Sequence, residues 1–209
     1  LIFTSDHGEM MGSHGCAPFT KQVPWSEASV VPLLIRWPRM HGDAGRAVRT
    51  PLNTADLLPT LMGMAGLRVP GSVEGEDLSR LIRGAPDEDR AALYMLVSPF
   101  HGQTAGNGEY RAVRTQTHTY VRCITGPWLL YDDAADPFQL RNLVAHPAHD
   151  SLRAELDARL QTELRKVGDD FHPRQYYLRR FGYEIAPHGS ISYAPGAPPQ
   201  SPRPTRLQR

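Results

Sequence analysis

Two patterns of hydrophobic residues divide the chain. In the first half, apolar runs without alternation at residues 1–3 and 30–37 are typical of strands covered on both faces, and we expect them in one sheet. An apolar stripe predicts a helix that begins at Asn53 or Thr54 and ends near Ala65, with its leucines in the core. The other elements predicted here are a short helix at 26–29, a helix within 75–84 and a strand at 91–97.

From residue 109 the pattern changes. Three β-prone runs at close spacing favour an antiparallel meander; they are residues 110–115, 119–124 and 128–131. The next helix is the clearest in the chain, because leucine recurs every four residues at Leu152, Leu156, Leu160 and Leu164. We expect Asp150 or Ser151 to cap its start and Gly168 to end it. Its single apolar stripe predicts that it lies on one face of the small sheet.

These patterns predict three parts. Residues 1–100 form the main part, residues 101–168 form the small sheet with its helix, and residues 169–209 form a C-terminal extension. The extension is rich in aromatic residues at first, so we expect it to wrap the surface, whereas its Pro-rich end from about Ala194 is typical of disorder. His101, in a Gly-rich polar loop, is interpreted as a surface histidine.

Composition adds little to this picture. The chain has 209 residues, a formal net charge of +1 and 40% hydrophobic residues, enough for one core with a smaller satellite. Nothing in it calls for a nucleic-acid or membrane partner, since no apolar stretch approaches the roughly 20 residues of a membrane span. The chain starts at Leu1, already inside a predicted strand, and we therefore expect it to be the C-terminal part of a longer protein.

The first strand is followed at once by candidate chemistry. Ser5, Asp6, His7 and Gly8 form a turn signal at the carboxyl end of the strand, where open α/β sheets bind their ligands. An acid beside an imidazole in that position suggests a metal or anion site. On these residues alone, a turn-forming Asp6 and a surface His7 remain an equal alternative.

Further motifs follow this strand. They are Gly12-Ser13-His14-Gly15, Lys21-Gln22-Val23-Pro24-Trp25-Ser26-Glu27 and Val31-Pro32-Leu33-Leu34-Ile35-Arg36-Trp37-Pro38. In order and spacing they resemble the sulfatase family, and residues 130–143 resemble its C-terminal signature. The resemblance implies an α/β fold: the C-terminal part of an alkaline-phosphatase-like sandwich, with a mainly parallel sheet and flanking helices, plus a small antiparallel sheet-and-helix subdomain.

The resemblance also implies roles for individual residues. Asp6 and His7 correspond to two ligands of one divalent cation, Ca²⁺, Mg²⁺ or Mn²⁺, whose other ligands lie upstream of this chain. Lys21 corresponds to the lysine that contacts the sulfate and the leaving-group oxygen. His14 either reaches the substrate or supports the site from behind, and Glu27 corresponds to an orienting residue. The nucleophile implied is a formylglycine made from an upstream residue.

Three features of the sequence invite other interpretations. Cys16-Ala17-Pro18 imitates the start of the family's nucleophile motif Cys-x-Pro-Ser/Ala-Arg, but it lacks the end of that motif and follows the Asp-His strand, whereas the family's nucleophile precedes that strand. Cys16 and Cys123 are therefore interpreted as partly buried hydrophobic residues. The acidic residues of 130–143 are interpreted as turn formers rather than metal ligands. The family's arginine before Val-Pro is missing.

Three hypotheses for function follow. The first is a metal-dependent sulfatase that hydrolyses a small-molecule or carbohydrate sulfate ester, with this chain inactive on its own because its nucleophile and further ligands lie upstream. The second is a phosphodiesterase or phosphonate monoester hydrolase of the same superfamily. The third is a truncated copy that binds without catalysing. The C-terminal signature favours the first over the second.

Overall fold

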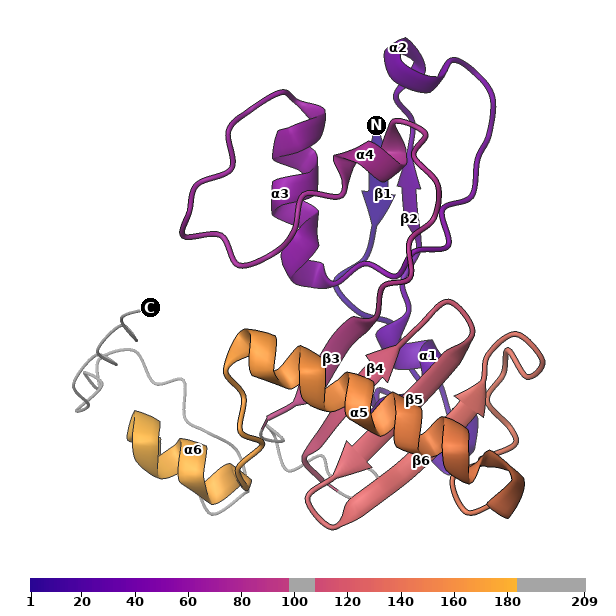
Figure 1. Cartoon of the computed structure of the whole chain (residues 1–209), viewed down its shortest axis with the longest axis vertical. Helices are drawn as coiled ribbons and strands as arrows, with labels where there is room; N and C mark the ends of the chain where they lie inside the picture. The colour runs from indigo at the N-terminus through magenta and orange to yellow at the C-terminus, as the bar shows by residue number, and fades with distance from the viewer. Residues whose placement is uncertain (98–107, 184–209) are drawn as a thin grey trace.

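The computed structural model describes residues 1–97 and 108–183, and the chain folds into two layered groups (Figure 1). One group holds strands β1 (Ile2–Thr4) and β2 (Leu33–Ile35) with helices α2 (Pro38–His41), α3 (Thr54–Met64) and α4 (Ser79–Ile82). The other holds strands β3 (Ala92–Leu96), β4 (Tyr110–Arg114), β5 (His118–Cys123) and β6 (Gly126–Asp132) with helices α1 (Ser26–Ser29) and α5 (Asp150–Val167). Helix α6 (Arg174–Phe181) follows α5.

The small sheet is an antiparallel meander in the order β3-β4-β5-β6, which confirms the predicted topology. Strand β3 lies before residue 100 and pairs with β4, so the sheet takes in residues on both sides of the predicted boundary. The predicted division into three parts otherwise stays a prediction. His101 and the residues from 194 onward lie outside the part of the chain that the structure describes.

Both faces of the small sheet are covered. On one face Val113, Tyr120 and Leu130 pack against the leucines of α5, as predicted, and α5 crosses this face in Figure 1. On the other face the neighbouring residues, among them Val121 and Leu129, form a second cluster with Trp25. Because successive side chains of a strand point to opposite faces, burial of both faces explains why neighbouring residues such as Tyr120 and Val121 are both buried.

Helix α5 begins one residue away from its expected cap. His149 occupies the N-cap position without a side-chain cap bond, and Asp150 is already helical and pairs with Arg153 at 3.0 Å. The prediction of Asp150 or Ser151 as the cap was therefore wrong. Asp150 lies in the first turn instead, where the helix dipole stabilises its carboxylate without a capping bond. Gly168 ends the helix with φ 67°, as predicted.

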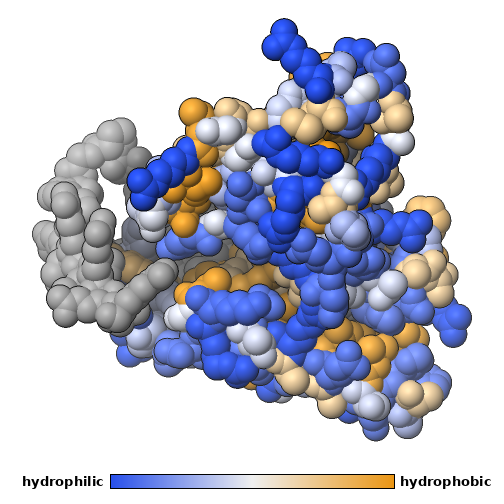
Figure 2. Space-filling view, turned by 45° about the horizontal axis from the view of Figure 1, so that its top comes forward, coloured by the Kyte–Doolittle hydropathy of each residue, from blue (hydrophilic) through white to orange (hydrophobic). Residues whose placement is uncertain are grey.

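Strands β1 and β2 differ from the expectation in two ways. They pair antiparallel, with Phe3 opposite Leu34, so the two strands of this chain do not themselves form the parallel part of the sandwich. They are also not buried within the chain, since Phe3 is 59% and Leu34 63% exposed. Leu61 and Met64 of α3 line a pocket together with Ile2 and Ile35 of the two strands. Apolar residues consequently reach the surface among hydrophilic ones (Figure 2). The α/β class and the small sheet-and-helix unit are confirmed.

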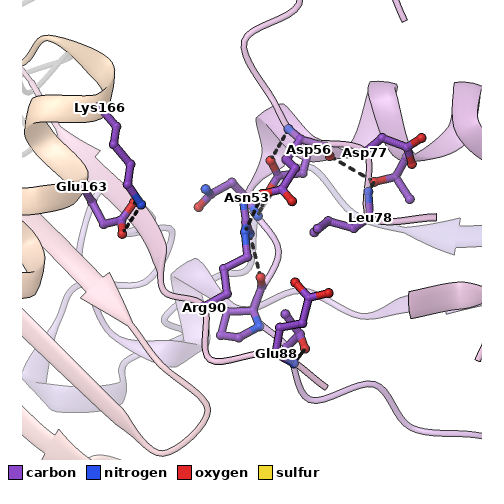
Figure 3. A network of polar contacts seen from close by, with 12 residues as sticks. Asn53, Asp56, Asp77, Leu78, Glu88, Arg90, Glu163 and Lys166 are labelled. Carbon is purple, nitrogen blue, oxygen red and sulfur yellow. Dashed lines mark hydrogen bonds and ion pairs between the residues drawn. The ribbon is translucent and has the colours of Figure 1, made fainter. Parts of the chain in front are cut away.

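Helix α3 has the predicted start and end but a different buried face. Asn53 and Asp56 form a capping box. The buried side chains are Asp56, Pro59 and Thr60, whereas Leu58 is exposed, so the expectation of a leucine stripe in the core was wrong. Polar contacts decide the orientation of the helix: Asp56 pairs with Arg90 at 2.7 Å, and the Thr60 hydroxyl accepts from the amide of Leu78 at 3.0 Å (Figure 3).

The C-terminal segment is attached to the sheet by a buried arginine. The side chain of Arg111 on β4 is fully buried and pairs with Asp169. Its guanidinium also lies 4.4 Å from the centroid of the Phe171 ring and donates to the hydroxyl of Tyr177. Burial opposes ionisation of Asp169, but hydrogen bonds from Arg111 and the Phe171 amide outweigh it, so the pKa of Asp169 is lowered. This buried ion pair therefore attaches the C-terminal segment to strand β4.

Removal of the Asp169 carboxylate is expected to destabilise the protein strongly. Asp169→Ala leaves the buried Arg111 charge without its partner, at a cost of about 3 kcal/mol in the free energy of unfolding, measured by denaturant titration. The matched control is Asp89→Ala, which removes an exposed partner of Arg159 and should have a much smaller effect. Because the folded-state pKa of Asp169 is lowered, the stabilisation is expected in full well above the ordinary pKa of 3.8 and is lost as the pH falls below it. Equal effects of the two substitutions would contradict this account.

Candidate active site

Main-chain hydrogen bonds fold residues 5–28 into one unit. The amide of Gly8 donates to the carbonyl of Ala28 at 2.9 Å, and the amide of Met10 donates to the carbonyl of Thr20 at 3.0 Å. Met10, Val23 and Ala28 form a small buried cluster between these bonds. The same local structure therefore contains the turn after β1, the loop that carries His14, and Lys21.

Asp6 and His7 form a pair at the end of β1. Asp6 Oδ1 accepts from the amide of His7 at 3.0 Å and from the Ser5 hydroxyl at 3.2 Å. The backbone hydrogen bond from His7, helped by that from Ser5, lowers the pKa of Asp6 and keeps it ionised. Asp6 Oδ2 lies 3.4 Å from His7 Nε2, and both side chains are open to solvent.

The pair presents a carboxylate oxygen and an imidazole nitrogen side by side, facing solvent. His7 Nδ1 lies 2.7 Å from the carbonyl of Gly8, which can only accept, so Nδ1 is the donor in this contact. Metal-binding histidines commonly donate their second nitrogen to a carbonyl in this way. A donor separation of 3.4 Å suits a cation about 2.0–2.4 Å from each donor. Residues 1–97 and 108–183 contain no cluster of three or more His, Cys, Asp or Glu suited to a metal.

His14 lies between an aromatic ring and a carboxylate. Its imidazole stacks on Trp25, with ring centroids 4.9 Å apart and an interplanar angle of 11°. Its Nε2 lies 3.4 Å from Glu27 Oε1, and the side chain is only 12% exposed. The other oxygen of Glu27 is buried without a hydrogen-bond partner in the described residues. Glu27 therefore faces His14.

Lys21 is exposed, and within the described chain its ammonium forms no ion pair or hydrogen bond. The positive charge is therefore available to an anionic ligand. No direct hydrogen bond or ion pair joins three groups of the site to one another: the pair Asp6 and His7, the pair His14 and Glu27, and Lys21. The structure brings them into one folded segment rather than into one contact network.

Cys16 does not have the properties of a nucleophile. Burial, and then the negative charge of nearby Glu27, raise the pKa of its thiol, so the thiol stays protonated at neutral pH. Cys123 is buried on the second face of the small sheet. Both cysteines are at least partly buried, as predicted.

Residues of the C-terminal signature form hydrogen bonds to Trp25 and Ser26, next to the candidate site. Trp25 donates its indole N–H to the Tyr131 hydroxyl at 3.1 Å, and the amide of Ser26 donates to Gln139 Oε1 at 2.9 Å. Asn142 accepts from the amides of Leu130 and Val144, at 3.0 and 3.1 Å, and the interpretation of this signature as structural stays a prediction. The contacts of Tyr131 and Gln139 to the site were not predicted, because they join residues more than 100 positions apart.

Comparisons with known proteins identify the family. The family model described as N-sulphoglucosamine sulphohydrolase, C-terminal, matches residues 12–166. The chain belongs to the sulfatase family. It is 46% identical over 184 residues to an ulvan-active sulfatase of Formosa agariphila, covering 88% of this chain and 36% of the relative. It is also 25% identical to an N-acetylglucosamine-6-O-sulfatase of Bacteroides thetaiotaomicron, covering 81% and 31%.

Solved structures agree with this assignment. A 2-O GAG sulfatase superposes with a TM-score of 0.70 at 26% identity, covering 81% of this chain and 37% of that one. A phosphonate monoester hydrolase of Agrobacterium radiobacter superposes with a TM-score of 0.61 at 28% identity, covering 93% and 39%. The sulfatase chain described here spans about a third of the length of the curated relatives it matches. No helix within residues 1–97 and 108–183 is long and apolar enough to cross a bilayer.

Gly8 is a position in this sulfatase segment where the packing leaves no room for a side chain. A Cβ at Gly8 would lie 1.8 Å from the carbonyl oxygen of Glu27, a backbone atom that cannot move without displacing α1. Gly8→Ala is expected to lower the free energy of unfolding by about 1–3 kcal/mol, measured by denaturant titration. Gly45→Ala is the control, because nothing lies within 4 Å of its added Cβ. A Gly8→Ala protein as stable as the control would show that the two segments are not in contact.

Proposed function

We propose that this chain forms part of a metal-dependent sulfatase that hydrolyses sulfate esters of a carbohydrate or another small molecule. The observation that carries the proposal is the paired geometry of Asp6 and His7 in a chain of this family, with the unpaired Lys21 in the same folded segment. Hydrolysis of a charged ester needs positive charge against its peripheral oxygens and a donor for the leaving group.

Asp6 and His7 are proposed to hold one divalent cation together with ligands from outside this chain. When bound, the cation supplies positive charge that polarises the ester oxygens. Asp6 offers an ionised oxygen and His7 a nitrogen lone pair, a mixed set that suits Mn²⁺ as well as Mg²⁺ or Ca²⁺.

Lys21 and His14 are proposed as the catalytic side chains that this chain contributes. The ammonium of Lys21 binds the ester and stabilises the negative charge that develops on the leaving-group oxygen. His14, held by Glu27, exchanges a proton with the substrate or its leaving group. The nucleophile, a formylglycine, is proposed to come from a residue outside this chain.

The names of the relatives support a sulfated carbohydrate as the substrate. One is an ulvan-active sulfatase, and another acts on 6-O-sulfated N-acetylglucosamine. A second candidate function is hydrolysis of phosphonate or phosphate esters, because phosphonate monoester hydrolases from two bacteria superpose on 90% and 93% of this chain. The higher identity to the ulvan-active sulfatase favours the first candidate.

Both candidates are tested by assaying the complete protein with matched esters. We expect 4-nitrophenyl sulfate and sulfated ulvan oligosaccharides to be hydrolysed with a kcat/KM at least tenfold above that for a 4-nitrophenyl phosphonate monoester. The reverse preference would establish the second candidate. A complete protein that binds but hydrolyses none of these esters would support the third hypothesis, a copy without catalytic activity.

Substitution of Asp6 is expected to remove both metal and activity in the complete protein. Asp6→Ala deletes an ionised oxygen donor, so the metal content measured by mass spectrometry should fall and turnover should be lost. The control is Asp132→Ala, whose carboxylate accepts from the amides of Ala134 and Ala135 in a turn and should leave turnover nearly unchanged. Retention of metal and turnover by Asp6→Ala would refute the ligand assignment.

Substitution of Lys21 is expected to act on turnover more than on binding. Lys21→Ala removes an interaction that strengthens as charge develops on the leaving group, so kcat should fall about 10²-fold or more. The loss should shrink for aryl sulfates with more acidic leaving groups, which need less charge stabilisation. Lys21→Arg should rescue poorly, because a planar guanidinium does not replace a compact ammonium. A uniform change of less than a few-fold across the ester series would identify Lys21 as a solvated surface residue.

A further inference from the structure

Trp25 connects the candidate site to the small sheet. On one side its ring stacks on the imidazole of His14. On the other side its indole N–H donates to the Tyr131 hydroxyl at 3.1 Å, and its ring meets that of Trp128 edge to face at 5.6 Å. Any movement of Trp25 relative to the sheet would therefore move the ring against which His14 rests.

The residue after Trp25 is tied to the same sheet. The amide of Ser26 donates to the side chain of Gln139, which is buried and donates in turn to Asp133 at 2.7 Å. The Ser26 hydroxyl accepts from Arg114 at 2.9 Å. Because Glu27 follows directly, these bonds also position the carboxylate that faces His14. Both neighbours of the imidazole thus depend on contacts to the sheet.

The backbone of His14 indicates that its position is imposed by its surroundings. Its φ of 53° lies in the left-handed region, which a residue with a Cβ adopts at a cost. Such conformations persist where surrounding structure enforces them, and they cluster at functional sites. Nε2 faces Glu27, while Nδ1 has no hydrogen-bond partner within residues 1–97 and 108–183. A carboxylate that orients an imidazole and leaves its second nitrogen open is the arrangement of a proton-transfer pair.

We propose that Trp25 and Tyr131 are positioning residues that hold the His14 imidazole in the orientation it needs for proton transfer. The catalytic consequence of this proposal rests on the function proposed above. The C-terminal signature thereby has a role beyond packing: its Tyr131 hydroxyl fixes the indole, and the indole fixes the imidazole. We call this group, which consists of Trp25, Tyr131 and the stacked ring of His14, the clamp.

The kinetic test uses matched tyrosine substitutions in the complete protein. Tyr131→Phe removes the hydroxyl that accepts from Trp25, whereas the control Tyr120→Phe removes a buried hydroxyl that donates to Asp157 at 2.8 Å on the opposite face of the same sheet. Misplacement of a reacting group by about 1 Å can cost 10²-fold in rate. We expect kcat to fall about tenfold in Tyr131→Phe and about 10²-fold in Trp25→Leu, with KM within about threefold, and no change in kcat for Tyr120→Phe. If both tyrosine variants lower the melting temperature but leave kcat unchanged, the contact is structural only and the proposal is overturned.

A second test does not depend on activity. Carbethoxylation of histidine by diethyl pyrocarbonate can be followed residue by residue by peptide mass spectrometry. His14, at 12% exposure, should react more slowly than His7, at 40%, and its rate should rise several-fold in Tyr131→Phe and Trp25→Leu but not in Tyr120→Phe. An unchanged His14 rate in both clamp variants would refute the clamp. If the complete protein hydrolyses no ester, the proposed function fails, whereas the clamp stands or falls on these reaction rates.

Discussion

The packing of the segment around Trp25 against the second face of the small sheet is the contact on which the rest of the structure depends. A four-stranded sheet with one apolar face needs a single covering layer, but this sheet has two apolar faces and α5 covers one of them. The other is covered by the segment that carries the candidate catalytic residues. The subdomain and the site are therefore one packed unit, since separating them would expose Trp25, Trp128 and Tyr131 together.

Paired polar groups decide which segments meet. Arg111 with Asp169, Arg90 with Asp56, and Gln139 with Ser26 are all partly or fully buried, and each would be costly to leave without its partner. These pairs join segments 34 to 113 residues apart in the chain, and their directional contacts restrict the arrangement more than hydrophobic packing alone would. Such pairs attach the C-terminal segment, helix α3 and the start of α1 to their neighbours, whereas α5 is held mainly by its leucines.

The candidate site follows the opposite rule. Asp6 and Lys21 are charged and exposed, and Lys21 has no partner of opposite charge within the described residues. The Asp6 carboxylate accepts hydrogen bonds from its neighbours Ser5 and His7, yet both Asp6 and Lys21 are open to solvent and to groups from outside the chain. This contrast between satisfied and available charge supports placing the chemistry at the end of β1 and in the loop that follows Thr20, in a chain that spans about a third of its relatives.

The sequence by itself determined the elements whose signals are local. The leucines of α5, the closely spaced strands of the meander and the capped start of α3 were predicted because their patterns repeat within a few residues. The candidate residues Asp6, His7, His14 and Lys21 were identified from their order and spacing in a motif. The exposure of β1 and β2 and the polar buried face of α3 were not, because burial depends on which other elements arrive. Only the tertiary structure decided that Tyr131 and Gln139 hold the site, since a contact across more than 100 residues leaves no periodic trace in the sequence.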